Sequence, residues 1–236
     1  MSAGATTLGL TADEWQAIRL TAELAGATTL ILLILSAPLA WWLTRSASRL
    51  ANAVAAAVSL PLVLPPTVIG FYLLIALGPQ GPIGGTLERL GLHHLAFSFT
   101  GILIGSVIYS LPFAVQPLRE AFGSIDARLL DAAATLRARG LDRFFSVVLP
   151  LSRSGVLTAV VITFAHTVGE FGVIAMLGGN ISGETRVVSI AIYDHTSALE
   201  YAAAHRLSAV LLGFSFLTLL AFYAINQRVM SPVKPQ

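Results

Sequence analysis

Apolar residues along this chain fall into five long stretches separated by short polar or charged segments. A helix of about 20 apolar residues crosses the roughly 30 Å hydrocarbon core of a bilayer. The pattern predicts spans at residues 20–44, 51–77, 95–115, 154–177 and 203–227. The second stretch contains Pro61, Pro65 and Pro66, so that helix should be kinked or broken midway. We therefore expect an all-α integral membrane protein, a bundle of about five transmembrane helices in which residues 1–236 form one domain.

Composition supports the same class and excludes others. Hydrophobic residues make up 56% of the 236 residues and charged residues 11%, whereas soluble domains carry about 25% charged residues. The formal net charge of +2 and the absence of a basic run give no support for nucleic-acid binding. The chain has no cysteine, which excludes disulfides, thiolate nucleophiles and cysteine-ligated metals.

The basic residues are distributed unevenly between the two sides defined by the expected spans. Ten of the fourteen lysines and arginines fall on one side: Arg45, Arg49, Arg119, Arg128, Arg137, Arg139, Arg143, Arg153, Arg228 and Lys234. The positive-inside rule makes that side cytoplasmic. We expect a multi-pass protein of the cytoplasmic (inner) membrane, with its N-terminus outside and its C-terminus in the cytoplasm.

The loop at residues 116–153, on the basic side, is too long for a simple connector. Ser124 and Asp126 can each cap a helix that runs to about Arg139, with Gly140 as its C-terminal stop. Its apolar positions recur at helical spacing and form one face: Ile125, Leu129, Ala132, Ala133 and Leu136. Such a helix could lie flat at the lipid interface or offer its small residues to a partner.

The spacing within this loop resembles the signature of ABC importer permeases. That signature reads Glu-Ala-Ala, three residues, Gly, nine residues, Ile, one residue, Leu-Pro. Here Asp131-Ala132-Ala133 is followed at the same spacings by Arg137 and by Val147-Val148-Leu149-Pro150. Two positions depart from it: Asp131 replaces glutamate and Arg137 replaces glycine. The second departure suggests that the turn moves to Gly140.

The resemblance implies that this helix docks into a cleft on a separate ATP-hydrolysing subunit and transmits its motion. The residues implied in coupling are Leu129, Asp131, Ala132, Ala133, Leu136, Arg137, Gly140, Leu149 and Pro150. In the family the permease works with two ATPase subunits, which bind ATP and magnesium, and with an external solute-binding protein. No cofactor and no catalytic residue is then expected on this chain.

Three further strings look like the molybdate/tungstate branch of that family, with sulfate and thiosulfate permeases close behind. They are the proline-rich string at residues 60–70, Gly169-Glu170-Phe171-Gly172, and the string at residues 180–186. The resemblance implies a homodimer with a pathway at the dimer interface, alternating access, and import of molybdate or tungstate. A sulfate permease is the alternative.

The pathway candidates are Pro65, Pro66, Thr67, Gly169, Glu170 and Gly172. A broken helix exposes backbone amides that favour anions, although an ordinary proline kink explains residues 65–67 equally well. A carboxylate would repel an imported anion, so we expect Glu170 to act as a gate or packing element that hydrogen-bonds neighbouring backbone, aided by close approach at Gly169 and Gly172. A buried structural carboxyl, or a proton relay with His166 in a secondary carrier, stays open.

Other chemistry finds little support in the sequence. Residues 178–185 match the spacing of a phosphate-binding loop, but Glu184 stands where that loop needs a lysine, so we reject ATP binding by this chain. His93, His94, His195 and His205 share no metal-ligand spacing. The sequence also shows neither the paired carboxylates nor the base beside a serine that an intramembrane enzyme would need.

Overall fold

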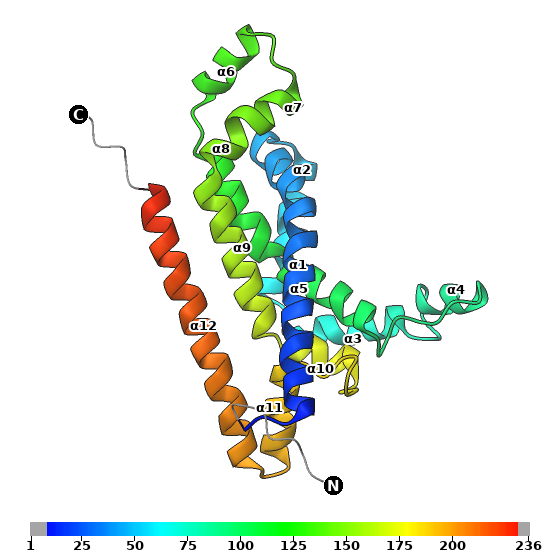
Figure 1. The fold of residues 1–236 in the computed structure, drawn as a ribbon. Helices are drawn as coiled ribbons and strands as arrows, with labels where there is room; N and C mark the ends of the chain where they lie inside the picture. The colour runs from blue at the N-terminus through cyan, green and yellow to red at the C-terminus, as the bar shows by residue number, and fades with distance from the viewer. Residues whose placement is uncertain (1–8, 231–236) are drawn as a thin grey trace.

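The computed structural model describes residues 9–230, with side chains to residue 226, and over that range every regular element is helical. Three helices form the central bundle: α1 (Ala12–Arg45), α5 (Phe99–Gly123) and α9 (Arg153–Val168), each packed against the other two. Helix α12 (Tyr201–Met230) runs beside α9 (Figure 1). The all-α membrane fold expected from the apolar stretches is confirmed.

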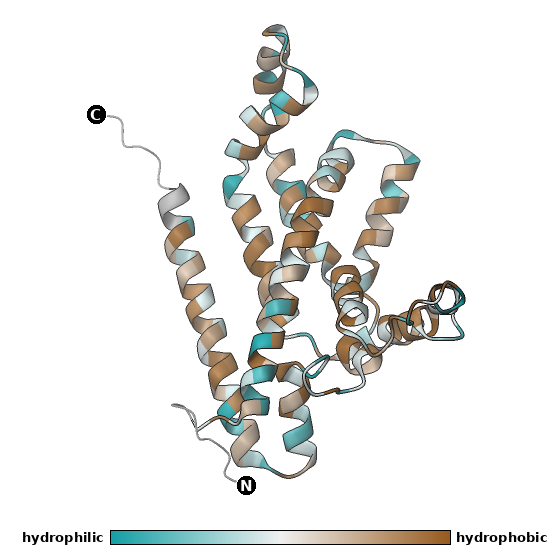
Figure 2. Ribbon diagram, turned by 45° about the vertical axis from the view of Figure 1, so that its right-hand side comes forward, coloured by the Kyte–Doolittle hydropathy of each residue, from teal (hydrophilic) through white to brown (hydrophobic). Residues whose placement is uncertain are grey.

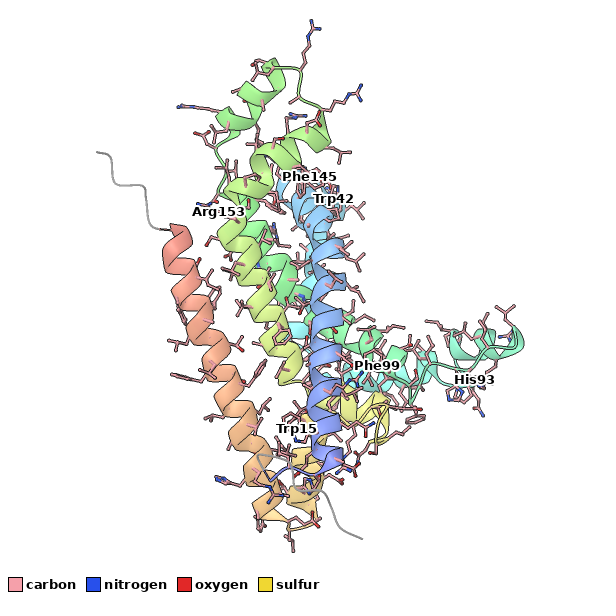
Figure 3. All side chains as sticks on the ribbon, in the orientation of Figure 1. Trp15, Trp42, His93, Phe99, Phe145 and Arg153 are labelled. Carbon is pink, nitrogen blue, oxygen red and sulfur yellow. The ribbon has the colours of Figure 1, made fainter. Side chains whose placement is uncertain are left out.

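Helix α1 is long enough to span a bilayer from one interface to the other. Its first turn is fixed by a capping box, in which the Glu14 amide donates to the Thr11 hydroxyl (3.2 Å) and the Thr11 amide donates to the Glu14 carboxylate. Trp15 and Trp42 lie near its opposite ends (Figure 3), about 40 Å apart along the axis at the helical rise. Tryptophans favour both membrane–water interfaces, so this helix indicates where the bilayer lies.

Among the described residues, three helices are long and apolar enough to cross a membrane, and two bent pairs raise the number to five if each pair is one span. Along most of their length these helices are predominantly hydrophobic (Figure 2). One bent pair joins residues 49–62 to α3 (Pro66–Leu77) at 108°, and the other joins residues 140–151 to α9 at 75°. The first bend falls where the prolines predicted a kink or break.

In the first bent pair, α2 (Arg49–Ser59) and the short 3-10 helix η1 (Leu60–Leu62) approach the bend from the basic end. Helix α3 then projects sideways with α4 (Gly84–Arg89) beyond it (Figure 1). The stretch expected as the fourth span, residues 154–177, is likewise divided, into α9 and the short α10 (Gly172–Gly178). The break at residues 169–171 was not anticipated from the sequence.

The stretch from Gly178 to about Ala202, between the fourth and fifth expected spans, contains a helix. It begins with tight turns, in which Gly179, Asn180 and Gly183 have positive φ. Helix α11 (Val188–Ser197) follows and packs on α1 and α12. Ile190 and Ala191 are buried, so one face of α11 is covered by neighbouring helices and not by water. This packing stabilises a helix in a stretch that is polar overall.

The expected boundary between the third span and the long loop is also shifted. Helix α5 runs to Gly123 rather than ending near Val115, because Leu118 and Phe122 remain buried in the bundle, and its internal prolines are tolerated as in other membrane helices. The long loop therefore begins at residue 124. The charges of Arg228 and Lys234, counted toward the basic side, lie outside the described side chains.

Candidate functional site

The first candidate site is the segment that joins α5 to α9, residues 124–152, which we call the coupling arm. It consists of α6 (Ala127–Thr135), α7 (Gly140–Arg143), the π-helical turn η2 (Phe144–Val148) and α8 (Leu149–Leu151). The arm extends beyond the bundle at the end where α1 terminates (Figure 1). Both of its attachment points are therefore on helices of the central bundle.

A cap and a single leucine fix the position of α6. The Asp126 carboxylate accepts a hydrogen bond from the Arg128 amide (2.9 Å), which satisfies one free donor of the first turn. Leu130 is 5% exposed and packs with Leu43, Phe122 and Val148 of the bundle and the arm. The apolar face expected from the sequence did not include Leu130, the residue that anchors the helix. The sequence offered only a second leucine directly after Leu129 as an indication that this side of the helix is also buried.

With Leu130 turned inward, the other apolar residues of α6 are left uncovered. Leu129 is 48% exposed and Leu136 is 83% exposed, and Ala132 between them is exposed as well. Ala133 is half-buried between this face and Leu130. Asp131 is also exposed. The arm thus presents a small apolar face that its own chain does not cover.

Helix α6 ends at Thr135 and the turn that closes it lies at Arg137, which corrects the expectation that the turn moves to Gly140. Arg137 adopts φ +61°, the left-handed conformation that closes many helices. Its amide donates to the Ala134 carbonyl (2.9 Å) and the Ala138 amide to the Ala133 carbonyl (3.2 Å), the pair of bonds of a Schellman motif. The turn therefore stays at the position where the signature has glycine, and Gly140 instead begins α7.

The end of the arm is fastened to the bundle by aromatic side chains. The ring of Phe144 packs edge-on against Trp41 of α1 and Phe122 of α5, with ring centroids 6.0 and 5.9 Å apart. Leu149 is half-buried and Pro150 exposed in the short α8. Phe145, labelled in Figure 3 at the end of the bundle where the arm begins, is 61% exposed. The segment from Asp142 to Leu149 is thus helical and continues the arm back to α9.

The second candidate site is where the two broken helices meet. A Cβ added to Gly172 would lie 2.7 Å from the Pro66 Cβ and 3.5 Å from the Thr67 amide nitrogen. One turn into α3, a Cβ added to Gly70 would lie 2.7 Å from the Cβ of Met176 in α10. The pathway candidates at residues 65–67 and 172, far apart in sequence, are therefore in contact, and α3 and α10 cross with almost no space between their backbones.

Glu170 lies in the break between α9 and α10 and is 4% exposed. Its backbone carbonyl accepts a hydrogen bond from the Ser189 hydroxyl (2.5 Å). Its carboxylate lies beside the Ser106 hydroxyl of α5, yet neither carboxylate oxygen has a hydrogen-bond partner among the described residues. The expectation that this carboxyl bonds neighbouring backbone is wrong for this conformation.

Gly169 does not make the close approach expected of it. Its nearest neighbours for an added Cβ are carbonyl oxygens of its own helix, at 3.7 and 3.8 Å, which is ordinary contact. Close packing in this motif is confined to Gly172. An intramembrane carboxyl without a partner usually faces a bundle interior or a pathway, so Glu170 remains a candidate for a role in conformational change.

His166 is directed toward α5. Its Nδ1 lies 3.0 Å from the Ser110 hydroxyl, and its ring stacks on Phe113 with centroids 3.8 Å apart. Among the residues with described side chains, no group of three or more His, Asp or Glu residues could hold a metal ion. His94 pairs with Glu88 (2.9 Å) near His93 on the lateral projection of Figure 3.

Comparison with known proteins identifies the family. Residues 33–232 match the family described as "Binding-protein-dependent transport system inner membrane component". The chain is 55% identical over 215 residues to the molybdenum transport system permease protein ModB of Azotobacter vinelandii, covering 91% of this chain and 95% of the relative. It is 35% identical over 213 residues to ModB of Escherichia coli K12, covering 89% and 93%.

Solved structures share the fold at lower sequence identity. A bacterial ABC transporter that imports the polysaccharide alginate matches with TM-score 0.74 at 22% identity, over 97% of this chain and 82% of that one. The MetNI methionine ABC transporter in an inward-facing conformation matches with TM-score 0.69 at 18% identity, over 92% and 95%. The chain belongs to the binding-protein-dependent transport system inner membrane component family of ABC importers.

Proposed function

We propose that this chain is the permease subunit of an ATP-driven importer that moves molybdate, or the closely similar tungstate, across the cytoplasmic membrane by alternating access. The observation that carries the proposal is the extent of its similarity to the Azotobacter vinelandii molybdenum permease, which covers nearly the whole of both chains. The chain itself performs no bond chemistry. ATP and magnesium are bound by the partner subunits.

The uncovered face of α6 supports a separate ATPase as the occupant of the coupling arm. Leu129, Ala132 and Leu136 form a narrow apolar strip, and Leu130 holds the helix that carries it. A rigid helix with small residues on its outer face suits a groove-shaped partner. Two ATPase subunits would engage two copies of the chain, one arm each, which motivates the homodimer with a pathway between the copies.

The distribution of basic residues supports an orientation in the membrane with the coupling arm on the cytoplasmic side. The arm and the adjoining ends of α1 and α2 hold Arg45, Arg49, Arg128, Arg137, Arg139 and Arg143. By the positive-inside rule this end is cytoplasmic, where ATP is available. The opposite end, with α11 and the N-terminus of α1, is then the external side that receives oxyanion from the binding protein.

The closed packing of α3 against α10 supports a role for the break residues in gating. Pro65, Pro66, Thr67, Gly169, Glu170 and Gly172 lie where two short helices meet. Short half-helices that abut at a break can separate without unwinding a whole span. His166 forms its hydrogen bond with Ser110 rather than with Glu170, which disfavours a proton relay through these two residues.

The test is solute-stimulated ATP hydrolysis by the reconstituted complex of this chain with its ATPase and binding protein. Molybdate and tungstate should each stimulate hydrolysis and be imported, whereas sulfate should do neither at the same concentration. Sulfate is the informative control because the chain is also 31% identical over 207 residues to a probable sulfate permease of Chlorella vulgaris. Stimulation by sulfate alone, or uptake that follows a proton gradient without ATP, would overturn the proposal.

A further inference from the structure

Helices α5 and α9 are in contact at two separate levels. Near the coupling arm, a Cβ added to Gly155 of α9 would lie 2.2 Å from the Ala121 Cβ and 3.2 Å from the Pro117 carbonyl oxygen. Only glycine allows the two backbones to come this close, as is common between membrane helices. The second level lies toward the break at residues 169–171 and is polar.

At the polar level, buried hydroxyl groups of both helices form a hydrogen-bond chain. The Ser110 oxygen lies 3.0 Å from His166 Nδ1 and 3.1 Å from the Thr167 hydroxyl, and Thr167 donates to the Thr163 carbonyl (2.9 Å). Each hydroxyl has one proton. Since Thr167 uses its proton on Thr163, its oxygen accepts from Ser110, and the Ser110 oxygen is left to accept from Nδ1–H of His166.

The imidazole ring is also held by aromatic side chains on the same helix as Ser110. It stacks on Phe113 at 3.8 Å between centroids and at an interplanar angle of 25°, and it contacts Tyr109 at 5.0 Å. Tyr109, Ser110 and Phe113 of α5 thus all contact the His166 ring of α9. Ser110 and Thr167 are 0% and 2% exposed, so without each other they would find no water to bond.

We propose that His166 is a positioning residue that fastens α9 to α5, so that the two helices move as one unit and carry the motion of the coupling arm to the break at Gly169 and Glu170. The arm leaves the end of α5 and re-enters at the start of α9. Force on the arm would otherwise spread these helices apart instead of displacing the break. The inference rests on the proposed function, in which an ATPase moves the arm.

Two substitutions separate the hydrogen bond from the ring packing. His166→Asn keeps an N–H donor near the position of Nδ1 but loses the stacked ring, whereas His166→Phe keeps a stacked ring but loses the donor. The measurement is the number of oxyanions imported per ATP hydrolysed in proteoliposomes, which a purely structural role in folding would leave unchanged in the molecules that fold.

His166→Phe should lower this ratio about tenfold, because it leaves the Ser110–Thr167 pair without its buried donor. His166→Asn, which keeps the donor and loses only the stacked ring, should lower the ratio much less. A His166→Phe protein with an unchanged ratio, or equal losses in both variants, would overturn the inference.

A cross-link tests the joint movement directly, because the chain has no cysteine of its own. In the double variant Ser110→Cys with Thr167→Cys, oxidation should join α5 to α9, since the two native oxygens are 3.1 Å apart. The reduced thiols do not reproduce the Ser110–Thr167 hydrogen bond, so the reduced form should import fewer oxyanions per ATP hydrolysed than the unmodified chain. The cross-link, which ties α5 to α9, should raise that ratio again. Loss of import on oxidation, restored by reduction and absent from the single-cysteine controls, would contradict the inference.

If the double-cysteine variant is inactive both oxidised and reduced, the comparison of His166→Phe with His166→Asn decides the outcome. Failure of the proposed function would be visible earlier and separately, because the unmodified chain would then import no oxyanion at all.

Discussion

Gly172 lies directly against Pro66, with only 2.7 Å available between the Pro66 Cβ and a Cβ at position 172. Neither partner can adjust easily, since one is backbone and the other is a rigid ring at the start of α3. The contact joins two segments about one hundred residues apart and brings together the two sequence strings that predicted a pathway. Of the two glycines in Gly169-Glu170-Phe171-Gly172, Gly172 is therefore the one that tolerates an added side chain less well.

Gly172→Ala should therefore separate α10 from α3 and impair transport. Overpacking of this kind costs about 1–3 kcal/mol, which should appear as a lower unfolding temperature in detergent and a reduced import rate. Gly169→Ala is the matched comparison within the motif, because its Cβ would meet only ordinary contacts. Gly213→Ala, with nothing within 4 Å, controls for a methyl group added to a membrane helix. Equal losses at 169 and 172 would contradict the packing argument.

Arg137→Gly should be tolerated, and should tighten the end of α6. Arg137 holds φ +61°, which costs a residue with a side chain about 1–2 kcal/mol and glycine little. The amides of residues 137 and 138, which make the two Schellman bonds, should then exchange more slowly with deuterium. Arg137→Val should speed their exchange, because β-branched residues resist this conformation. Faster exchange in the glycine variant would show that the turn is held by something else.

Leu136→Glu should abolish binding of the ATPase while leaving the chain inserted and folded. Leu136 is 83% exposed on the uncovered strip of α6, so a carboxylate there is hydrated in the free chain but unpaired inside an apolar groove. Copurification of the ATPase with the tagged permease measures the effect, and Ala133→Glu should act in the same direction. Ala127→Glu is the control, because residue 127 is exposed on the far side of α6 in its first turn, where negative charge is favourable. ATPase copurifying normally with Leu136→Glu would remove the docking proposal.

Leu130→Ala should weaken the arm by a different route. Leu130 is 5% exposed and packs with Phe122 and Val148, and truncation of a buried leucine costs about 2–5 kcal/mol. We expect the arm to become sensitive to limited proteolysis between residues 124 and 140 while the membrane helices stay intact. Unchanged proteolysis would mean that Leu130 does not anchor the helix.

Glu170→Gln should leave the affinity for the delivered oxyanion nearly unchanged and alter the coupling of ATP hydrolysis to transport. Glutamine keeps the shape of the side chain but removes a buried charge whose oxygens have no partner among the described residues. The unfolding temperature should therefore not fall, since no hydrogen bond to the carboxylate is lost. Basal and oxyanion-stimulated ATPase rates, measured together with oxyanion affinity, check the prediction. A large loss of affinity with normal coupling would assign Glu170 to binding instead.

Much of the fold could be predicted because lipid imposes a simple rule. Long uncharged stretches must become helices, and α1, α5 and α12 each contain most of one expected stretch, although α5 continues past the expected end to Gly123. The helix in the arm was also predictable, since Asp126 caps it and its alanines and leucines recur at helical spacing. The left-handed turn at Arg137 was predicted to move to Gly140 because arginine is a poor residue for it. The Schellman bonds keep the turn in place, and their combined effect cannot be judged from one residue.

The sequence by itself determined that this chain belongs in a membrane, that one end is basic, and that a helical arm with small apolar residues lies at that end. Each of these follows from residue type and spacing, which act locally. Only the tertiary structure decided that Leu130 faces the bundle and Leu136 does not, that Gly172 meets Pro66, and that His166 reaches Ser110 rather than Glu170. These contacts depend on how each helix is rotated about its axis and how it crosses its neighbours. In a chain this uniformly apolar, many rotations bury equal hydrophobic surface. Close packing and buried hydrogen bonds therefore decide which rotation is adopted.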